Sequence, residues 1–196
     1  MKKTLLHILT AFIIIPAVNA QESVYPAKKQ DAPIVILNGT IHVGNGQVLN
    51  NTSIEIINGK IASIGNNINS SANAIKVDAK GKHVYPGLIL SSSNLGLVEV
   101  NSVRATADFS EIGEFNPSVR SLVAYNTDSK VINTLKTNGI THANIVPQGG
   151  TISGSASVVQ LDAWNWEDAA YAKDNAIHLN LPSLYNRPNP YAAFLG

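Results

Sequence analysis

Short runs of β-branched residues, separated by turn-forming residues, dominate positions 33–83. The runs cover 34–37, 40–43, 53–57, 60–64 and 74–78. Asn58-Gly59 lies between two of them and favours a tight hairpin, because both residues of such a turn need a positive φ. Asn38-Gly39 predicts a further turn. Residues 33–83 are therefore expected to form a small β-rich unit, preceded by a polar, flexible lead-in over 21–32.

The hydrophobic period changes after this unit. Strands are expected over 83–90, 140–146, 156–161 and 176–181, and a helix over 128–138. Thr127 or Asp128 can cap the start of that helix, and Gly139 stands where a left-handed residue ends it. Asn165 can cap a second helix that begins at Trp166. Strands that alternate with helices indicate crossover connections and a parallel sheet, so the predicted fold class is α/β.

The first twenty residues have the pattern of a cleavable export signal. Lys2 and Lys3 precede a short apolar stretch, and Val18-Asn19-Ala20 matches a signal-peptidase site. The apolar stretch is too short to span a bilayer comfortably, which makes an uncleaved anchor the weaker alternative. The sequence therefore predicts cleavage after Ala20 and an exported, periplasmic or secreted protein without membrane attachment.

Composition narrows the function classes. Removing 20 of the 196 residues leaves 176, and losing Lys2 and Lys3 lowers the basic residues from 14 to 12 against 13 acidic ones, a net charge of −1. A near-neutral chain offers no electrostatic reason to bind nucleic acid. The absence of cysteine excludes disulfides, thiolate metal sites and a cysteine nucleophile.

One series of motifs resembles a known family. It runs through Asn38-Gly39-Thr40, Asn58-Gly59-Lys60-Ile61, Val77-Asp78-Ala79-Lys80-Gly81-Lys82, Pro86-Gly87-Leu88-Ile89, Gly139-Ile140-Thr141-His142 and Gln160-Leu161-Asp162. Together they resemble the N-terminal part of the amidohydrolase superfamily, in its imidazolonepropionase-like and prolidase-like branch. The resemblance implies a β-sandwich-like unit over 33–83 and a (β/α)₈ TIM-type barrel beginning at residue 84. It also implies hydrolysis of C–N bonds in non-peptide amides, cyclic amides or dipeptides, with a divalent metal, commonly zinc, activating water.

The chain departs from the family pattern at its first metal motif. Family members carry His-x-His at the end of the first barrel strand, where side chains two apart face the same side. Ser92 and Asn94 occupy those positions here. A hydroxyl and an amide are poor replacements for imidazole on zinc. We therefore expect no metal to be bound by this chain alone, and no catalytic residue is identified.

The barrel is also short. Such barrels typically need about 250 residues, and the 196-residue chain has only 106 after Leu90. Residues 84–196 are thus expected to form a partial, truncated barrel: a fragment, or one completed by a second polypeptide or another copy. Two functions stay open. One is hydrolysis of a small-molecule substrate, which this chain alone is not expected to perform; the other is a non-catalytic barrel, or pseudoenzyme, that binds a ligand or a partner.

Other candidate residues are weaker. His142 and His178 fall within predicted barrel strands and could lie at the barrel mouth, whereas His42 and His83 are expected to be structural; no two of these histidines have ligand spacing. A small-residue loop over 148–155 could face an anion but lacks the lysine of a phosphate loop. Arg104 and Arg120 could hold an anionic substrate group or, equally, be structural. Structural or solvated roles are expected for the remaining candidates, which are Glu99, Asp108, Glu111, Glu114, Trp164 and Trp166.

Overall fold

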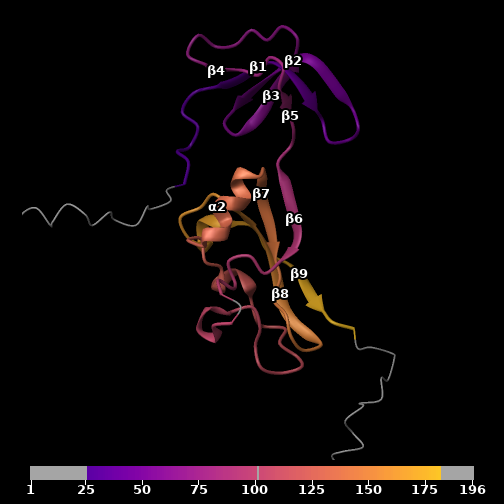
Figure 1. Ribbon diagram of the computed structural model, residues 1–196, viewed down its shortest axis with the longest axis vertical. Coiled ribbons are helices and arrows are strands. Elements are labelled where there is room, and N and C mark those ends of the chain that lie inside the picture. The colour runs from indigo at the N-terminus through magenta and orange to yellow at the C-terminus, as the bar shows by residue number, and fades with distance from the viewer. Residues whose placement is uncertain (1–25, 101, 182–196) are drawn as a thin grey trace, which may run out of the picture.

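The computed structural model describes residues 26–100 and 102–181, which form two β-rich units (Figure 1). Each unit is built on one sheet, and Tyr85-Pro86-Gly87 connects them. The expected signal peptide, the first part of the lead-in and residues 182–196 lie outside the described residues. None of the helices in the described part is long and apolar enough to cross a membrane.

The first unit is one five-stranded sheet. Its strands are β1 (Ile34–His42), β2 (Val48–Ile57), β3 (Lys60–Gly65), β4 (Ile75–Asp78) and β5 (His83–Val84). Strand β1 pairs antiparallel with β2 and parallel with both β4 and β5, while β3 pairs with β2. The described residues show a single sheet here, so the expected sandwich-like unit is not seen.

The two Asn-Gly pairs of this unit have different structures. Asn58 and Gly59 have φ of 52° and 70° and connect β2 to β3, which confirms the predicted hairpin. Asn38 also has a positive φ, of 58°, but lies inside β1, where the register with β2 shifts. The predicted turn at Asn38-Gly39 is therefore wrong: one continuous strand carries a β-bulge there. The Asn38 backbone N–H donates to Ser53 Oγ at 3.3 Å, which fixes the bulge against β2.

The second unit is a four-stranded sheet in the order β6-β7-β8-β9. Its strands are β6 (Leu88–Ser93), β7 (Ile140–Ile145), β8 (Ile152–Gln160) and β9 (Ala170–Leu179). Only β6 and β7 are parallel, connected through helix α2 (Lys130–Thr137); β8 pairs antiparallel with β7 and with β9. The fold is mixed α/β, as predicted, but the described residues show neither a parallel sheet throughout nor a barrel.

The connections explain why the crossover pattern stops after β7. Only residues 146–151 connect β7 to β8, and Gly149 and Gly150 turn the chain there with φ of 90° and 61°. Parallel strands need a connection of roughly a dozen residues or more, so this short turn produces an antiparallel pair. Helix α3 (Trp166–Ala169) has only four residues and sits inside a second antiparallel connection.

Several predicted boundaries change for local reasons. Tyr85-Pro86-Gly87 divides the strand expected over 83–90 into β5 and β6, while β8 and β9 begin earlier than predicted, at Ile152 and Ala170. Asn165 does cap α3, because its Oδ1 accepts the Asp168 N–H at 2.8 Å. Helix α2 begins later than expected, with Ser129 at its N-cap, so neither Thr127 nor Asp128 caps it. The Ser129 hydroxyl donates instead to Glu99 Oε2 at 3.0 Å.

The hydrophobic core of the second unit covers one face of its sheet. Helix α2 and the irregular segments 94–100 and 102–129, with 3₁₀ turns η2 (Arg104–Thr106) and η3 (Ser121–Ala124), supply the covering side and lie on the same side of the sheet (Figure 1). The buried core residues are Leu95, Leu97, Leu122, Tyr125, Ile132, Ala143, Ile145, Val159, Leu161 and Ala169. The partly exposed side chains of β7, including His142 and Asn144, alternate with the buried Ala143 and Ile145 and so occupy the opposite face.

Candidate functional site

The candidate site is a hollow of about 210 Å³ at the second sheet. It is lined by Ser91, Ser92, Asn144, Val146, Ala156, Ala176, Ile177 and His178. The strand register brings these residues together: Ala156 pairs with Ala176 across β8 and β9, and Gly154 pairs with His178. Asn144 pairs with Val158 on the other side of β8. Small alanine side chains at the centre leave the space.

His178 is held in one orientation at the rim of this hollow. Its Nδ1 lies 2.8 Å from the carbonyl oxygen of Pro147. A carbonyl only accepts hydrogen bonds, so Nδ1 carries the proton in the neutral ring and Nε2 keeps its lone pair. His178 Nε2 is therefore available as an acceptor or a ligand.

Asn144 presents the hollow's unsatisfied polar atom. Its Nδ2 donates to the carbonyl oxygen of Ser91 at 3.2 Å, whereas its Oδ1 is buried and has no hydrogen-bond partner among the described residues. A buried acceptor without a partner costs about 1–3 kcal/mol. Because this oxygen is shielded from solvent, a ligand N–H or O–H in the hollow would recover that cost only after the Asn144 side chain turned toward it. Nothing in the sequence pattern marked Asn144 for this role.

The predicted site residues divide into two groups. Ser92 and His178 both line the hollow. Asn94 lies one residue beyond the end of β6 and is not among the lining residues; its carbonyl accepts the Leu97 N–H at 2.9 Å in a turn. His142 also lies outside the lining. Its Nδ1 is 3.0 Å from Thr141 Oγ1, and its ring makes an edge-to-face contact with the Tyr171 ring, with centroids 4.9 Å apart.

The donor set does not fit the family's zinc centre. Zinc sites use three or four strong ligands, namely imidazole, thiolate or carboxylate. The hollow is lined by one histidine, two serines and one asparagine, and by no carboxylate. Within 26–100 and 102–181, no group of three or more His, Cys, Asp or Glu residues could hold a metal ion.

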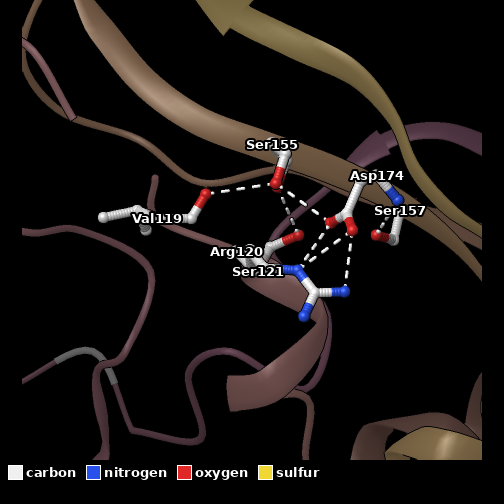
Figure 2. Close-up of polar contacts among 6 residues, drawn as sticks. All are labelled: Val119, Arg120, Ser121, Ser155, Ser157 and Asp174. Carbon is white, nitrogen blue, oxygen red and sulfur yellow. Dashed lines mark hydrogen bonds and ion pairs between the residues drawn. The ribbon is translucent and has the colours of Figure 1, made fainter. Parts of the chain in front are cut away.

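Arg120 forms an ion pair that fastens the irregular segment to the sheet (Figure 2). Its Nε lies 3.0 Å from both carboxylate oxygens of Asp174, and a terminal nitrogen lies 2.7 Å from Oδ2. Ser155 Oγ donates to Asp174 Oδ1 at 3.0 Å, and the Asp174 N–H donates to Ser157 Oγ at 2.9 Å. The hydrogen bond from Arg120 lowers the pKa of Asp174, and the carboxylate raises the pKa of Arg120. Arg120 therefore has a structural partner, which favours the structural role among the two that the sequence left open.

The small-residue loop, Arg104 and Trp166 also have structural contacts. In the small-residue loop, the N–H groups of Thr151 and Ile152 both donate to the Glu114 carbonyl, at 2.8 and 2.9 Å, so neither is available to an anion. A guanidinium nitrogen of Arg104 donates to the Ala107 carbonyl at 2.7 Å. Trp166 packs against the core, as expected for an aromatic at a helix entry.

Two histidines that lie far apart in the sequence meet in the first unit. His42 Nε2 lies 2.9 Å from His83 Nδ1, and the His42 ring stacks on Tyr85 with centroids 4.1 Å apart. Sequence spacing missed this pair because the contact depends on the parallel pairing of β1 with β5. In the local sequence, Tyr85 close after His83 is the feature that could have indicated a cluster of rings here.

Comparison with solved structures identifies the fold. An amidohydrolase from Thermotoga maritima MSB8 matches with a TM-score of 0.69 and 24% identity, over 74% of this chain and 38% of that chain. A prolidase complexed with N-methylphosphonate-L-proline matches with a TM-score of 0.42 and 20% identity, over 58% and 26% of the two chains. Molinate hydrolase matches with a TM-score of 0.31 and 31% identity, over 35% and 15%. No protein-family model matches the sequence, and no curated protein matches it.

The first of these matches confirms, at the level of the fold, the predicted resemblance to the N-terminal part of an amidohydrolase. The matched region spans well under half of the Thermotoga protein. What the two folds share is therefore a portion of the larger architecture.

Proposed function

We propose that this chain is an amidohydrolase-family protein whose described part binds a small polar ligand and does not itself hydrolyse C–N bonds. The observation that carries the proposal is the chemistry of the hollow: one oriented imidazole, two serines and one asparagine with an unsatisfied amide oxygen, without a carboxylate. These groups can hydrogen-bond a ligand. They cannot position a metal and its water, which hydrolysis in this family requires.

The size and polarity of the hollow indicate the kind of ligand. Ligand pockets usually occupy about 300–1,000 Å³, so a hollow of about 210 Å³ accepts only one small group. Asn144 Oδ1 and His178 Nε2 are both acceptors and favour a group that donates hydrogen bonds, such as a primary amide or an amine. The apolar lining from Val146 and Ile177 suits a short aliphatic portion beside it.

A second function is metal-dependent hydrolysis by a larger assembly. The likeness to part of an amidohydrolase favours it. Metal ligands would then come from a second polypeptide or another copy of this chain. In that assembly His178 could contribute one imidazole, because its second nitrogen is already oriented by Pro147 in the manner common to metal-ligating histidines.

Measuring bound metal and amide hydrolysis on the same purified protein separates the two functions. For the ligand-binding function we expect no metal whose binding depends on His178, no chelator-sensitive cleavage of amide or dipeptide substrates, and millimolar binding of small amides by NMR. Asn144→Leu should abolish that binding, because it removes the acceptor, while His142→Ala outside the hollow should leave it unchanged. Chelator-sensitive turnover by the 196-residue protein alone would contradict the proposal.

We also propose that the protein acts outside the cytoplasm. The predicted signal peptide supports this location, and N-terminal sequencing of the exported product should find Gln21 first. An intact Met1 start on a membrane-bound product would support the anchor alternative instead.

A further inference from the structure

We propose that His42 and His83, with Tyr85 beside them, form a surface site for a late first-row divalent cation, with copper(II) bound more tightly than nickel(II) or zinc(II). This site lies in the first unit and is independent of the hollow at the second sheet. Imidazole nitrogen suits these three ions, and their intrinsic affinity order places copper first.

The separation of the two nitrogens supports chelation. Metal–nitrogen bonds of about 2.0–2.1 Å, at an angle near 90–110°, place two ligand nitrogens roughly 2.8–3.4 Å apart. His42 Nε2 and His83 Nδ1 are 2.9 Å apart. Each ring can stay neutral by keeping its proton on its other nitrogen, His42 Nδ1 or His83 Nε2. In the hydrogen bond the two nitrogens point at each other, so a cation can replace the shared hydrogen only when both rings turn until their lone pairs converge on an ion beside the line that joins the nitrogens.

The backbone holds the two histidines in place. His42 ends β1 and pairs with Val48 of β2. His83 begins β5 and pairs with Thr40 of β1, and the Thr40 N–H donates to the Lys82 carbonyl at 3.0 Å. Because both histidines are fixed on neighbouring strands, little chain entropy opposes chelation.

Tyr85 restricts the His42 ring further. The two rings are stacked and nearly parallel, with an interplanar angle of 12° and centroids 4.1 Å apart. His83 is exposed and His42 is half-buried, so solvent can complete the coordination shell. With only two protein ligands, the site should bind reversibly and should leave positions open for water or a small anion.

Copper(II) titration of the full protein, prepared without a histidine tag at about pH 7.5, tests this site. We expect one high-affinity copper per chain and electron paramagnetic resonance couplings from two equatorial nitrogens. His42→Ala and His83→Ala should each weaken binding at least about tenfold, which is the loss that even outer-shell changes can cause at metal sites. His142→Ala is the matched control and should leave the affinity unchanged.

Both substitutions are at the surface, and circular dichroism should show that the variants remain folded. Equal copper affinity in wild type and His83→Ala, or couplings from a single nitrogen in wild type, would overturn the proposal. A loss of affinity in His142→Ala as large as that in His42→Ala would also overturn it, because binding would then be nonspecific.

Discussion

Arg120 and Asp174 join two segments of the second unit through three close nitrogen–oxygen contacts of 2.7–3.0 Å. Arg120 lies in the irregular segment before η3, whereas Asp174 lies in β9 with a positive φ of 47°. The Asp174 backbone is fixed by Ser157 and its carboxylate by Ser155. This ion pair therefore closes the covering segment onto the far strand of the sheet.

The ion pair predicts a pH-dependent stability. Hydrogen bonding from Arg120 lowers the pKa of Asp174 below 3.8 in the folded protein. The contribution of the ion pair to folding stability is therefore fully present above about pH 4, the range of the unfolded pKa, and disappears as the pH falls through the lower pKa of the folded state. Asp174→Asn should lower the melting temperature at pH 7, and the gap from wild type should shrink toward pH 2.

Arg120→Met provides the matched control. It removes the other half of the same pair. In thermal melts from pH 2 to 7, the difference in melting temperature between wild type and Arg120→Met should therefore also shrink as the pH falls. The double variant should be little worse than either single one. A gap that stays constant across this range in both variants would show that the pair adds no pH-dependent stability.

Gly150 should tolerate no side chain. Its φ is 61°, and an added Cβ would lie 2.5 Å from the Gly113 carbonyl oxygen and 2.8 Å from that of Glu114. A positive φ costs an L-residue about 1–2 kcal/mol, and forcing the packed backbone apart costs about 1–3 kcal/mol more. Gly150→Ala should thus lower the free energy of unfolding by about 2–5 kcal/mol in urea denaturation.

A substitution at Gly139 separates the cost of the positive φ from the cost of the steric contact. Its φ of 82° is also positive, but nothing lies within 4 Å of an added Cβ. Gly139→Ala should therefore cost only the conformational part, about 1–2 kcal/mol. Equal losses in the two variants would mean that the contact with residues 113 and 114 has no energetic consequence.

Tyr125→Phe should stabilise the protein. The Tyr125 ring is buried in the core, and its hydroxyl has no hydrogen-bond partner among the described residues. Burial raises the pKa of this hydroxyl, which stays protonated. Removing an unsatisfied buried polar group should gain about 1 kcal/mol of unfolding free energy, measured by urea denaturation. Tyr125→Leu, which leaves a cavity, should lose about 2 kcal/mol or more; a comparable loss in Tyr125→Phe would show that the hydroxyl is bonded in solution.

Local chemistry made part of this fold predictable. The hairpin at Asn58-Gly59 and the left-handed Gly139 after α2 depend on the φ preferences of single residues. The Asn165 cap depends on a side chain three residues from its partner. Asn38 shows the limit of such rules: it has the predicted positive φ, but contacts with Ser53 and Asp78 on other strands make it a bulge instead of a turn.

Long-range pairing was not predictable from the same patterns. A strand such as β9 has the same alternation whether it pairs parallel or antiparallel, so the antiparallel β8–β9 pair followed from the connection and not from the strand. The site shows the same limit. The resemblance and the strand positions pointed to Ser92 and His178. Asn144 could not be recognised from the sequence, because its interest lies in an unsatisfied buried oxygen that only the structure shows. His42 could not be paired with His83 from the sequence, because 41 residues separate them.

Introducing the His-x-His motif that the resemblance implies tests whether a zinc site can form at the hollow. In Ser92→His/Asn94→His, position 92 lines the hollow with His178, but position 94 lies beyond β6 in a turn and outside the lining. The two new imidazoles should therefore fail to converge with His178, because two strand residues share a face only where the strand continues through both. Both proteins, with and without the two new histidines, should also carry His83→Ala, which removes zinc binding at the His42–His83 pair. Elemental analysis after dialysis against zinc should then find no stoichiometric metal in either protein. One tightly held zinc in the double variant, lost again on His178→Ala, would show that the strand extends to residue 94 in solution and that the three imidazoles converge on one ion.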